Sequence, residues 1–183
     1  MESYNLQPHF DDWKMDMDWT GEPVKCAHQT EKSLLPRRVA YPNFNVVQPV
    51  VTIAKGEIEE VAIPEKPWRV MGRRSIGPGM KGFKDYEIEH LPSVDIQGYA
   101  TSNLSEVKEL YSPHSETTIG DHEFQIYDLG TNLTGFIGAG FNCNRASRIV
   151  ITFDEIQTKG DVDYQRLKCN NLIELNCQPG KYT

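Results

Sequence analysis

The adjacent carboxylates Asp154 and Glu155 come closest, by type and spacing, to residues that do acid–base chemistry. Glycoside hydrolysis uses two carboxyl groups that flank the bond to be broken. The apolar run at residues 149–153 predicts a strand that continues into both acids, and successive side chains of a strand point to opposite faces. Asp154 and Glu155 therefore cannot act as a pair on one ligand. No other acidic pair stands out, so the sequence predicts no catalytic residue.

The other sequence motifs that mark catalytic or cofactor sites give equally little support for such a site in this chain. The chain has no H-E-x-x-H and no G-x-S-x-G. Residues 77–82, GPGMKG, match G-x-G-x-x-G, but a dinucleotide site needs a strand before the loop and a helix after it, and neither is indicated. We interpret this stretch as a glycine-rich loop and expect no cofactor and no metal. Cysteine–histidine catalysis has no local signature, and the sequence leaves it open.

Aromatic side chains are the best candidates for ligand contact. Five of them stand in loop-like context, where they stack on sugars or pack against the protein: Trp13, Trp19, Tyr41, Trp68 and Tyr99. Both roles stay open for each residue. The cysteines, Cys26, Cys143, Cys169 and Cys177, contain no C-x-x-C pair, and we expect half-buried free thiols, with a disulfide as the open alternative.

The elements that must position these residues are mainly strands. Residues 1–45 show no period and predict an irregular N-terminal segment, whereas residues 46–183 predict one β domain. In the second part, short runs at 46–54, 58–63, 124–129, 136–143, 149–156 and 171–177 alternate or are β-branched, and turn residues separate most of them. One short helix is predicted from Asn103, with Glu106 completing a capping box, to Pro113. This pattern is typical of an all-β sandwich or barrel.

Length and charge restrict the partners. The chain has 183 residues, which is too short for a large catalytic barrel, and a net charge of -7, which disfavours nucleic acid as a partner. From Lys66 to Lys84 there are six bases and no acid, a run that we interpret as a solvated loop. No run of 18 apolar residues exists, so we expect no membrane span. No signal peptide is visible, and the compartment stays open.

Residues 124–183 carry a more specific pattern. Tyr127 to Phe136, YDLGTNLTGF, resembles the Y-D-x-G-x-N-x-x-G-[FWY] motif of bacterial α-L-rhamnosidases, glycoside hydrolase family 78. The following strand that ends at Glu155, and the stretch from Asn171 to Tyr182 with its Pro-Gly-x-Tyr corner, are also similar to that family. Trp13 and residues 34–42 resemble its segment before the sandwich more weakly, and residues 64–120 carry no resemblance.

The resemblance implies a jelly-roll-like antiparallel β-sandwich that precedes an (α/α)6 barrel, where the catalytic acid and base lie. We therefore expect a non-catalytic sandwich, truncated at its C-terminus, whose last strand is an edge open to self-association. The motif residues are expected to hold the fold: Asp128, Gly130, Asn132, Gly135 and Glu155. For Glu155 a sugar contact is the alternative.

Three hypotheses follow. In the first, the chain supports the missing barrel of the same polypeptide or presents a rhamnose-containing glycan to it. In the second, it is a stand-alone carbohydrate-binding module that uses Trp13, Trp19, Trp68 and Tyr41. In the third, it is a structural interaction domain that oligomerises through an edge strand.

Overall fold

The structure is a computed structural model, and it describes residues 2–15, 17, 25–33, 35–36, 38–41, 43–67, 91–113, 115–166 and 170–183. Several sequence predictions lie outside these residues: Trp19, Trp68, the glycine-rich loop at 77–82 and Cys169. The prediction of an all-β fold is confirmed. Among the described residues, the helical elements are a short α-helix and isolated 3-10 turns.

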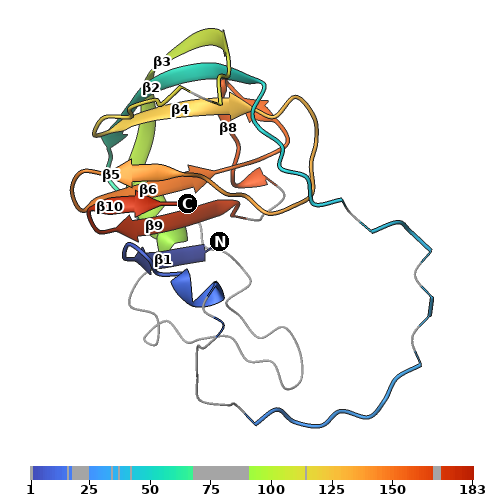
Figure 1. The fold of residues 1–183 in the computed structure, drawn as a ribbon. Coiled ribbons are helices and arrows are strands. Elements are labelled where there is room, and N and C mark those ends of the chain that lie inside the picture. Colours follow the sequence, from blue (N-terminus) through green and yellow to red (C-terminus); the bar gives the residue numbers. More distant parts are fainter. Residues whose placement is uncertain are drawn as a thin grey trace.

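Strands account for most of the regular structure (Figure 1). In chain order they are β1 (Glu2–Leu6), β2 (Val51–Glu60), β3 (Tyr99–Leu110), β4 (Glu123–Asp128), β5 (Phe141–Cys143), β6 (Ser147–Thr152), β7 (Gln157–Thr158), β8 (Asp161–Val162), β9 (Leu172–Cys177) and β10 (Gly180–Tyr182). The helical elements are η1 (Asp12–Lys14), α1 (Pro92–Asp95) and η4 (Ile96–Gly98). The strands form sheets in the orders β1-β9-β6, β10-β5, β3-β2-β4 and β7-β8. In Figure 1 the β3-β2-β4 sheet lies above β5, β6, β9, β10 and β1.

The predicted helix from Asn103 to Pro113 is wrong, because these residues belong largely to β3. The pairing of β3 with β2 is interrupted twice, between Thr52 and Ala54 and between Lys55 and Glu57. On β3 these irregularities coincide with Asn103 (φ 47°) and Lys108 (φ 53°), and each adds one residue to the strand. Half-buried positions on β3 therefore recur every two or three residues, a spacing similar to that of the apolar face of a helix.

Strand β2 runs through Gly56, where the sequence predicts a break between two strands. A Cβ atom at this position would lie 2.7 Å from the ring of Phe124 on β4 and 2.8 Å from the Ser102 carbonyl oxygen on β3. Glycine is therefore needed for close packing inside the sheet rather than for a turn. The continuous strand ends at Glu60, shortly before Pro64.

The N-terminal residues join the fold directly. The sequence predicts an irregular segment over 1–45, but Glu2–Leu6 form β1, which pairs in parallel with β9. Residues 25–50 contain no helix or strand where the structure describes them, and this connection loops away from the sheets (Figure 1).

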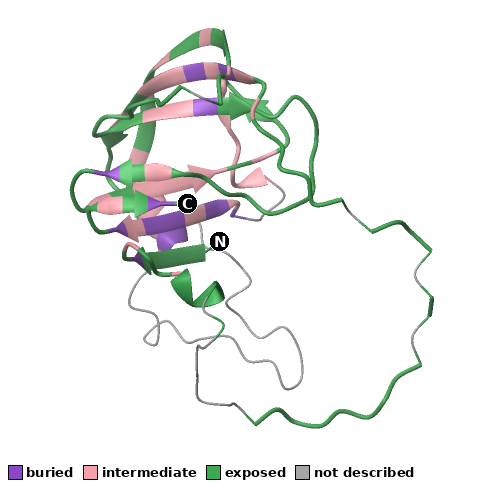
Figure 2. Cartoon of the chain, in the orientation of Figure 1, coloured by how far each residue is buried: buried purple, intermediate pink, exposed green. Residues whose placement is uncertain are grey.

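The main core lies between the β1-β9-β6 sheet and the β5-β10 ribbon. Its buried members are Leu6, Cys143, Leu175, Cys177 and Tyr182. Phe141 stacks on Tyr182 with ring centroids 5.1 Å apart, and the isoleucines of β6 and β9 pack around the cluster. Figure 2 shows buried positions concentrated along β9, the central strand of its sheet. This core fixes the positions of the side chains on the opposite face of β9.

Candidate functional site

The face of the β1-β9-β6 sheet that points away from the main core carries a cluster of polar side chains next to Val150 and Leu172. Because side chains alternate along a strand, Glu174 and Asn176 lie on the face opposite to Leu175 and Cys177. The register places Ser3 beside Glu174 and Asn5 beside Asn176. Arg148 on β6 lies opposite Asn176, so polar side chains from three adjacent strands meet here.

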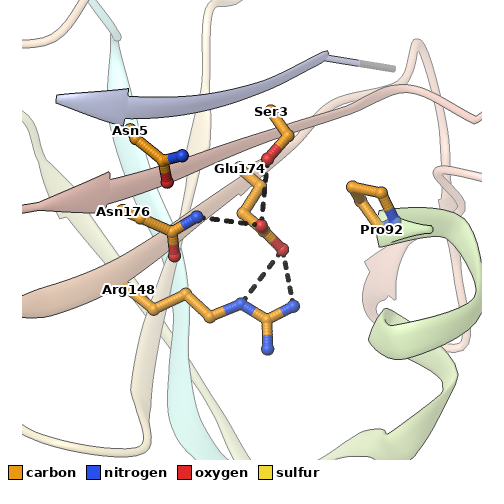
Figure 3. A pocket seen from close by; sticks show the side chains of 6 residues that line it. All are labelled: Ser3, Asn5, Pro92, Arg148, Glu174 and Asn176. Carbon is orange, nitrogen blue, oxygen red and sulfur yellow. Dashed lines mark hydrogen bonds and ion pairs between the residues drawn. The ribbon is translucent and has the colours of Figure 1, made fainter. Parts of the chain in front are cut away.

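Glu174 lies at the centre of this polar cluster. Its side chain is 1% exposed, and its Oε2 accepts hydrogen bonds from Arg148 Nε (3.0 Å) and Nη2 (2.6 Å). Its Oε1 accepts from Ser3 Oγ (3.1 Å) and Asn176 Nδ2 (3.2 Å). Figure 3 shows the side chains of Arg148, Ser3 and Asn176 converging on the carboxylate. A buried carboxylate needs this compensation, since an unpaired one would lose several kcal/mol of hydration.

An open pocket of about 470 Å³ lies over the cluster, lined by Ser3, Asn5, Pro92, Arg148, Glu174 and Asn176. Pro92, the first residue of α1, forms an apolar part of the wall (Figure 3). At the edge, the Arg148 guanidinium carbon lies 5.5 Å from the centre of the Tyr99 ring, in cation–π range. The wall thus offers hydroxyl, amide and guanidinium groups together with one apolar surface.

The described side chains of the pocket wall are mainly hydrogen-bonding groups. Among the described wall residues Glu174 is the carboxylate, and its oxygens already accept four hydrogen bonds. An acid–base pair for glycoside hydrolysis therefore cannot form from its wall residues. Asn5, Asn176 and Ser3 are instead the side-chain types that exchange hydrogen bonds with hydroxyl groups.

Asp154 and Glu155 lie beyond the end of β6, which corrects the prediction that they share a strand and point to opposite faces. Arg166 binds both of them. Its Nε and Nη2 donate to the two Asp154 oxygens at 2.6 and 2.9 Å, and Nη2 also lies 3.2 Å from Glu155 Oε2. The hydrogen bonds from Arg166 hold the pKa of the Asp154 carboxyl below its ordinary value. Both acids brace the chain between β6 and β9, away from the pocket.

The residues of the resemblance motif lie after β4. Asp128 Oδ1 accepts a hydrogen bond from the Gly130 amide (2.7 Å), the turn contact that the pattern predicts. Gly130 has φ 72°, and a Cβ atom there would lie 2.9 Å from Val50 Cγ2. Gly135 differs from the prediction, because it has neither a positive φ nor a neighbour within 4 Å of a Cβ position. Asn132 is exposed.

The predicted aromatic candidates that the structure describes, Trp13, Tyr41 and Tyr99, do not line a common pocket. Of those in the described part of the chain, Trp13 lies in η1 and Tyr41 in the connection before β2, and neither lines the pocket. Tyr99 lies at the pocket edge against Arg148. The wall residues were missed because the sequence does not show which strands pair. The alternation of polar and apolar residues over Glu2–Leu6 and Leu172–Cys177 was the available signal.

The cysteines also differ from the prediction of half-buried thiols. Of the three cysteines in the described part of the chain, Cys26 is exposed whereas Cys143 and Cys177 are buried. Among the described residues, no group of three or more His, Cys, Asp or Glu side chains is arranged to hold a metal ion.

Comparison with known proteins adds no assignment: no family model, no curated protein and no solved structure matches the chain. Within the part of the chain that the structure describes, no helix has the length and apolar character needed to span a membrane.

Proposed function

We propose that the chain is a non-catalytic β-sandwich of an α-L-rhamnosidase-like glycoside hydrolase, with a jelly-roll-like topology, and that it presents a glycan to a catalytic barrel. The observation that carries the binding role is the polar pocket over β1, β9 and β6, with one saturated carboxylate surrounded by amide and hydroxyl groups. The motif from Tyr127 to Phe136 supports the family, and Asp128 and Gly130 make the turn that such a motif requires.

The pocket suits the hydroxyl groups of a sugar. Ser3 and Asn5 are exposed on the edge strand β1, so a ligand reaches them without rearrangement of the sheet. Asn176 donates one amide hydrogen bond to Glu174 and keeps its carbonyl oxygen as an acceptor. Pro92 gives an apolar contact for a ring face or a methyl group, and the 6-deoxy carbon of rhamnose is such a group.

Two measurements on the wild-type chain test this function. Titration of rhamnosyl oligosaccharides by calorimetry should give saturable binding, and incubation with an aryl α-L-rhamnoside should release no aglycone at an enzymatic rate. Turnover at such a rate would show that this chain is itself catalytic and would contradict the proposal. Absence of heat with the whole panel would rule out the glycan-presenting role.

A paired variant locates the binding. Replacing Asn5 and Asn176 by alanine removes two amides from the wall, and we expect binding to weaken about tenfold or more, since each lost hydrogen bond contributes about 1 kcal/mol. Asn142→Ala, at an exposed position on β5, is the control and should leave binding unchanged.

An interaction domain is the second candidate, and one observation favours it. The chain after the motif turn exposes large apolar side chains, with Phe136 95% exposed and Leu133 and Ile137 about half exposed at 44% and 48%. A catalytic barrel or a second copy of the chain would cover them. Light scattering tests self-association: Phe136→Ser should reduce an observed oligomer to the monomer, whereas Tyr41→Ser, at a similarly exposed site, should not.

A further inference from the structure

The Arg148–Glu174 pair joins β6 to β9 and lies in the pocket wall. Arg148 is the cation in the pocket wall, and its side chain is 32% exposed. Glu174 is nearly inaccessible at 1% exposure, so a ligand in the pocket meets the guanidinium and not the carboxylate. Two nitrogens of the guanidinium face Glu174, and the third, Nη1, lies 3.4 Å from the Tyr99 hydroxyl.

We infer that Glu174 determines specificity by cancelling the charge of Arg148, so that the pocket selects neutral sugars and rejects sugars that carry a carboxylate. This inference rests on the proposed function. An uncompensated guanidinium in a pocket is the usual recognition group for a carboxylate, which it binds through two parallel hydrogen bonds. Here Glu174 occupies the Nε and Nη2 positions that such a ligand would use.

The other wall residues agree with a neutral ligand. Ser3, Asn5, Asn176 and Pro92 carry no charge, so among the described wall residues only Arg148 and Glu174 are ionic. Ser3 and Asn176 both donate to the Oε1 atom of Glu174, which keeps the carboxylate turned toward Arg148. A uronate entering the pocket would bring a second carboxylate beside Glu174 and would displace an existing hydrogen-bonded pair to bind Arg148. A neutral sugar can bind without displacing the hydrogen bonds between Arg148 and Glu174.

The test compares the binding of three sugars: methyl α-L-rhamnopyranoside, methyl α-D-galactopyranoside and methyl α-D-galacturonopyranoside. The last two form a matched pair, in which only the galacturonoside carries a carboxylate. Binding is followed by NMR shifts of the Asn5 and Asn176 side-chain amides. We expect the wild type to bind the uronate about tenfold more weakly than its neutral counterpart. In Glu174→Gln this ratio should move by about tenfold or more toward the uronate, because the charge of Arg148 is no longer cancelled and a neutral amide holds the guanidinium less strongly than a carboxylate. Glu155→Gln, which removes a carboxylate from the separate Arg166 cluster, should leave the ratio unchanged.

Each outcome separates this inference from the proposed function. A wild type that binds neutral and anionic sugars equally, or a folded Glu174→Gln variant that gains no uronate binding, overturns the inference and leaves glycan presentation standing. A wild type that binds no sugar, together with a variant that gains uronate binding, overturns glycan presentation and supports the charge cancellation. If Glu174→Gln does not fold, a competition experiment on the wild type tests the inference. If the uronate displaces the rhamnoside as easily as the galactoside does, the inference is overturned.

Discussion

Arg148 and Glu174 pair diagonally across β6 and β9. In the register of these strands Glu174 lies opposite Val150, and Arg148 lies opposite Asn176, one pair along the same face. The guanidinium bridges this offset and brings Nη2 within 2.6 Å of Glu174 Oε2. Long side chains reach such diagonal neighbours in antiparallel strands. The pair therefore connects two rungs of the sheet directly beneath the pocket.

Substitutions of Arg148 and Glu174 should have strongly non-additive effects on the free energy of unfolding. Arg148→Met leaves the Glu174 carboxylate buried without its cation, and we expect a loss of about 3–5 kcal/mol in the free energy of unfolding. Replacing both residues by methionine removes the stranded charge, so the double variant should lose much less than the single one. Urea denaturation of wild type, both single variants and the double variant measures the coupling. Additive losses would contradict the pairing.

Asp154 should add an acid-sensitive component to stability. Arg166 lowers the pKa of this carboxyl in the folded chain, so the stabilisation is present above the ordinary value of 3.8 and is lost as pH falls through the folded pKa. The Asp154 side chain is 3% exposed, and Asp154→Asn should cost about 2 kcal/mol at neutral pH, the loss of charge-assisted hydrogen bonds. Urea midpoints measured from about pH 2 to about pH 7 should converge for wild type and variant at the acid end. Glu155→Gln, at the more exposed partner, is the control and should change the profile little.

The sequence was informative about strands and uninformative about their partners. Period-two alternation correctly indicated the regions of β4, β6 and β9, since each has one face in the core. It failed over β3, where the added residues at Asn103 and Lys108 change the spacing of half-buried positions.

The pocket could not be predicted for a related reason. Ser3 and Glu174 are 171 positions apart in the chain, and local patterns contain no information about a parallel pairing between the two ends. The same limit applies to Arg166, which binds Asp154 because the chain turns back after β8. Long-range pairing, rather than residue type, decides both clusters.

The two motif glycines should differ in their tolerance of a side chain. Gly130 has φ 72°, a region that costs other residues about 1–2 kcal/mol, and a Cβ atom would also press on Val50. Gly130→Ala should therefore lower the free energy of unfolding by at least about 1 kcal/mol. Gly135→Ala meets open space at a φ that is not positive and should change stability little. Thermal or urea unfolding of the two variants distinguishes them, and equal effects would contradict a specific turn role for Gly130.

The cysteines should react at very different rates in the folded chain. Burial raises the pKa of the Cys177 thiol to about 11, and neighbouring Cys143 adds to the shift. Alkylation requires the thiolate, so at pH near 8 Cys177 should be modified about a hundredfold more slowly than a thiol with the ordinary cysteine pKa. Iodoacetamide labelling followed by peptide mass spectrometry measures each site separately. In urea the rates at Cys26, Cys143 and Cys177 should become similar, because the core that shields the last two is lost. Rapid labelling of Cys177 in the folded chain would show that this thiol lies outside the core between the β1-β9-β6 sheet and the β5-β10 ribbon. It would also contradict the orientation of β9 that places Glu174 and Asn176 on the opposite face.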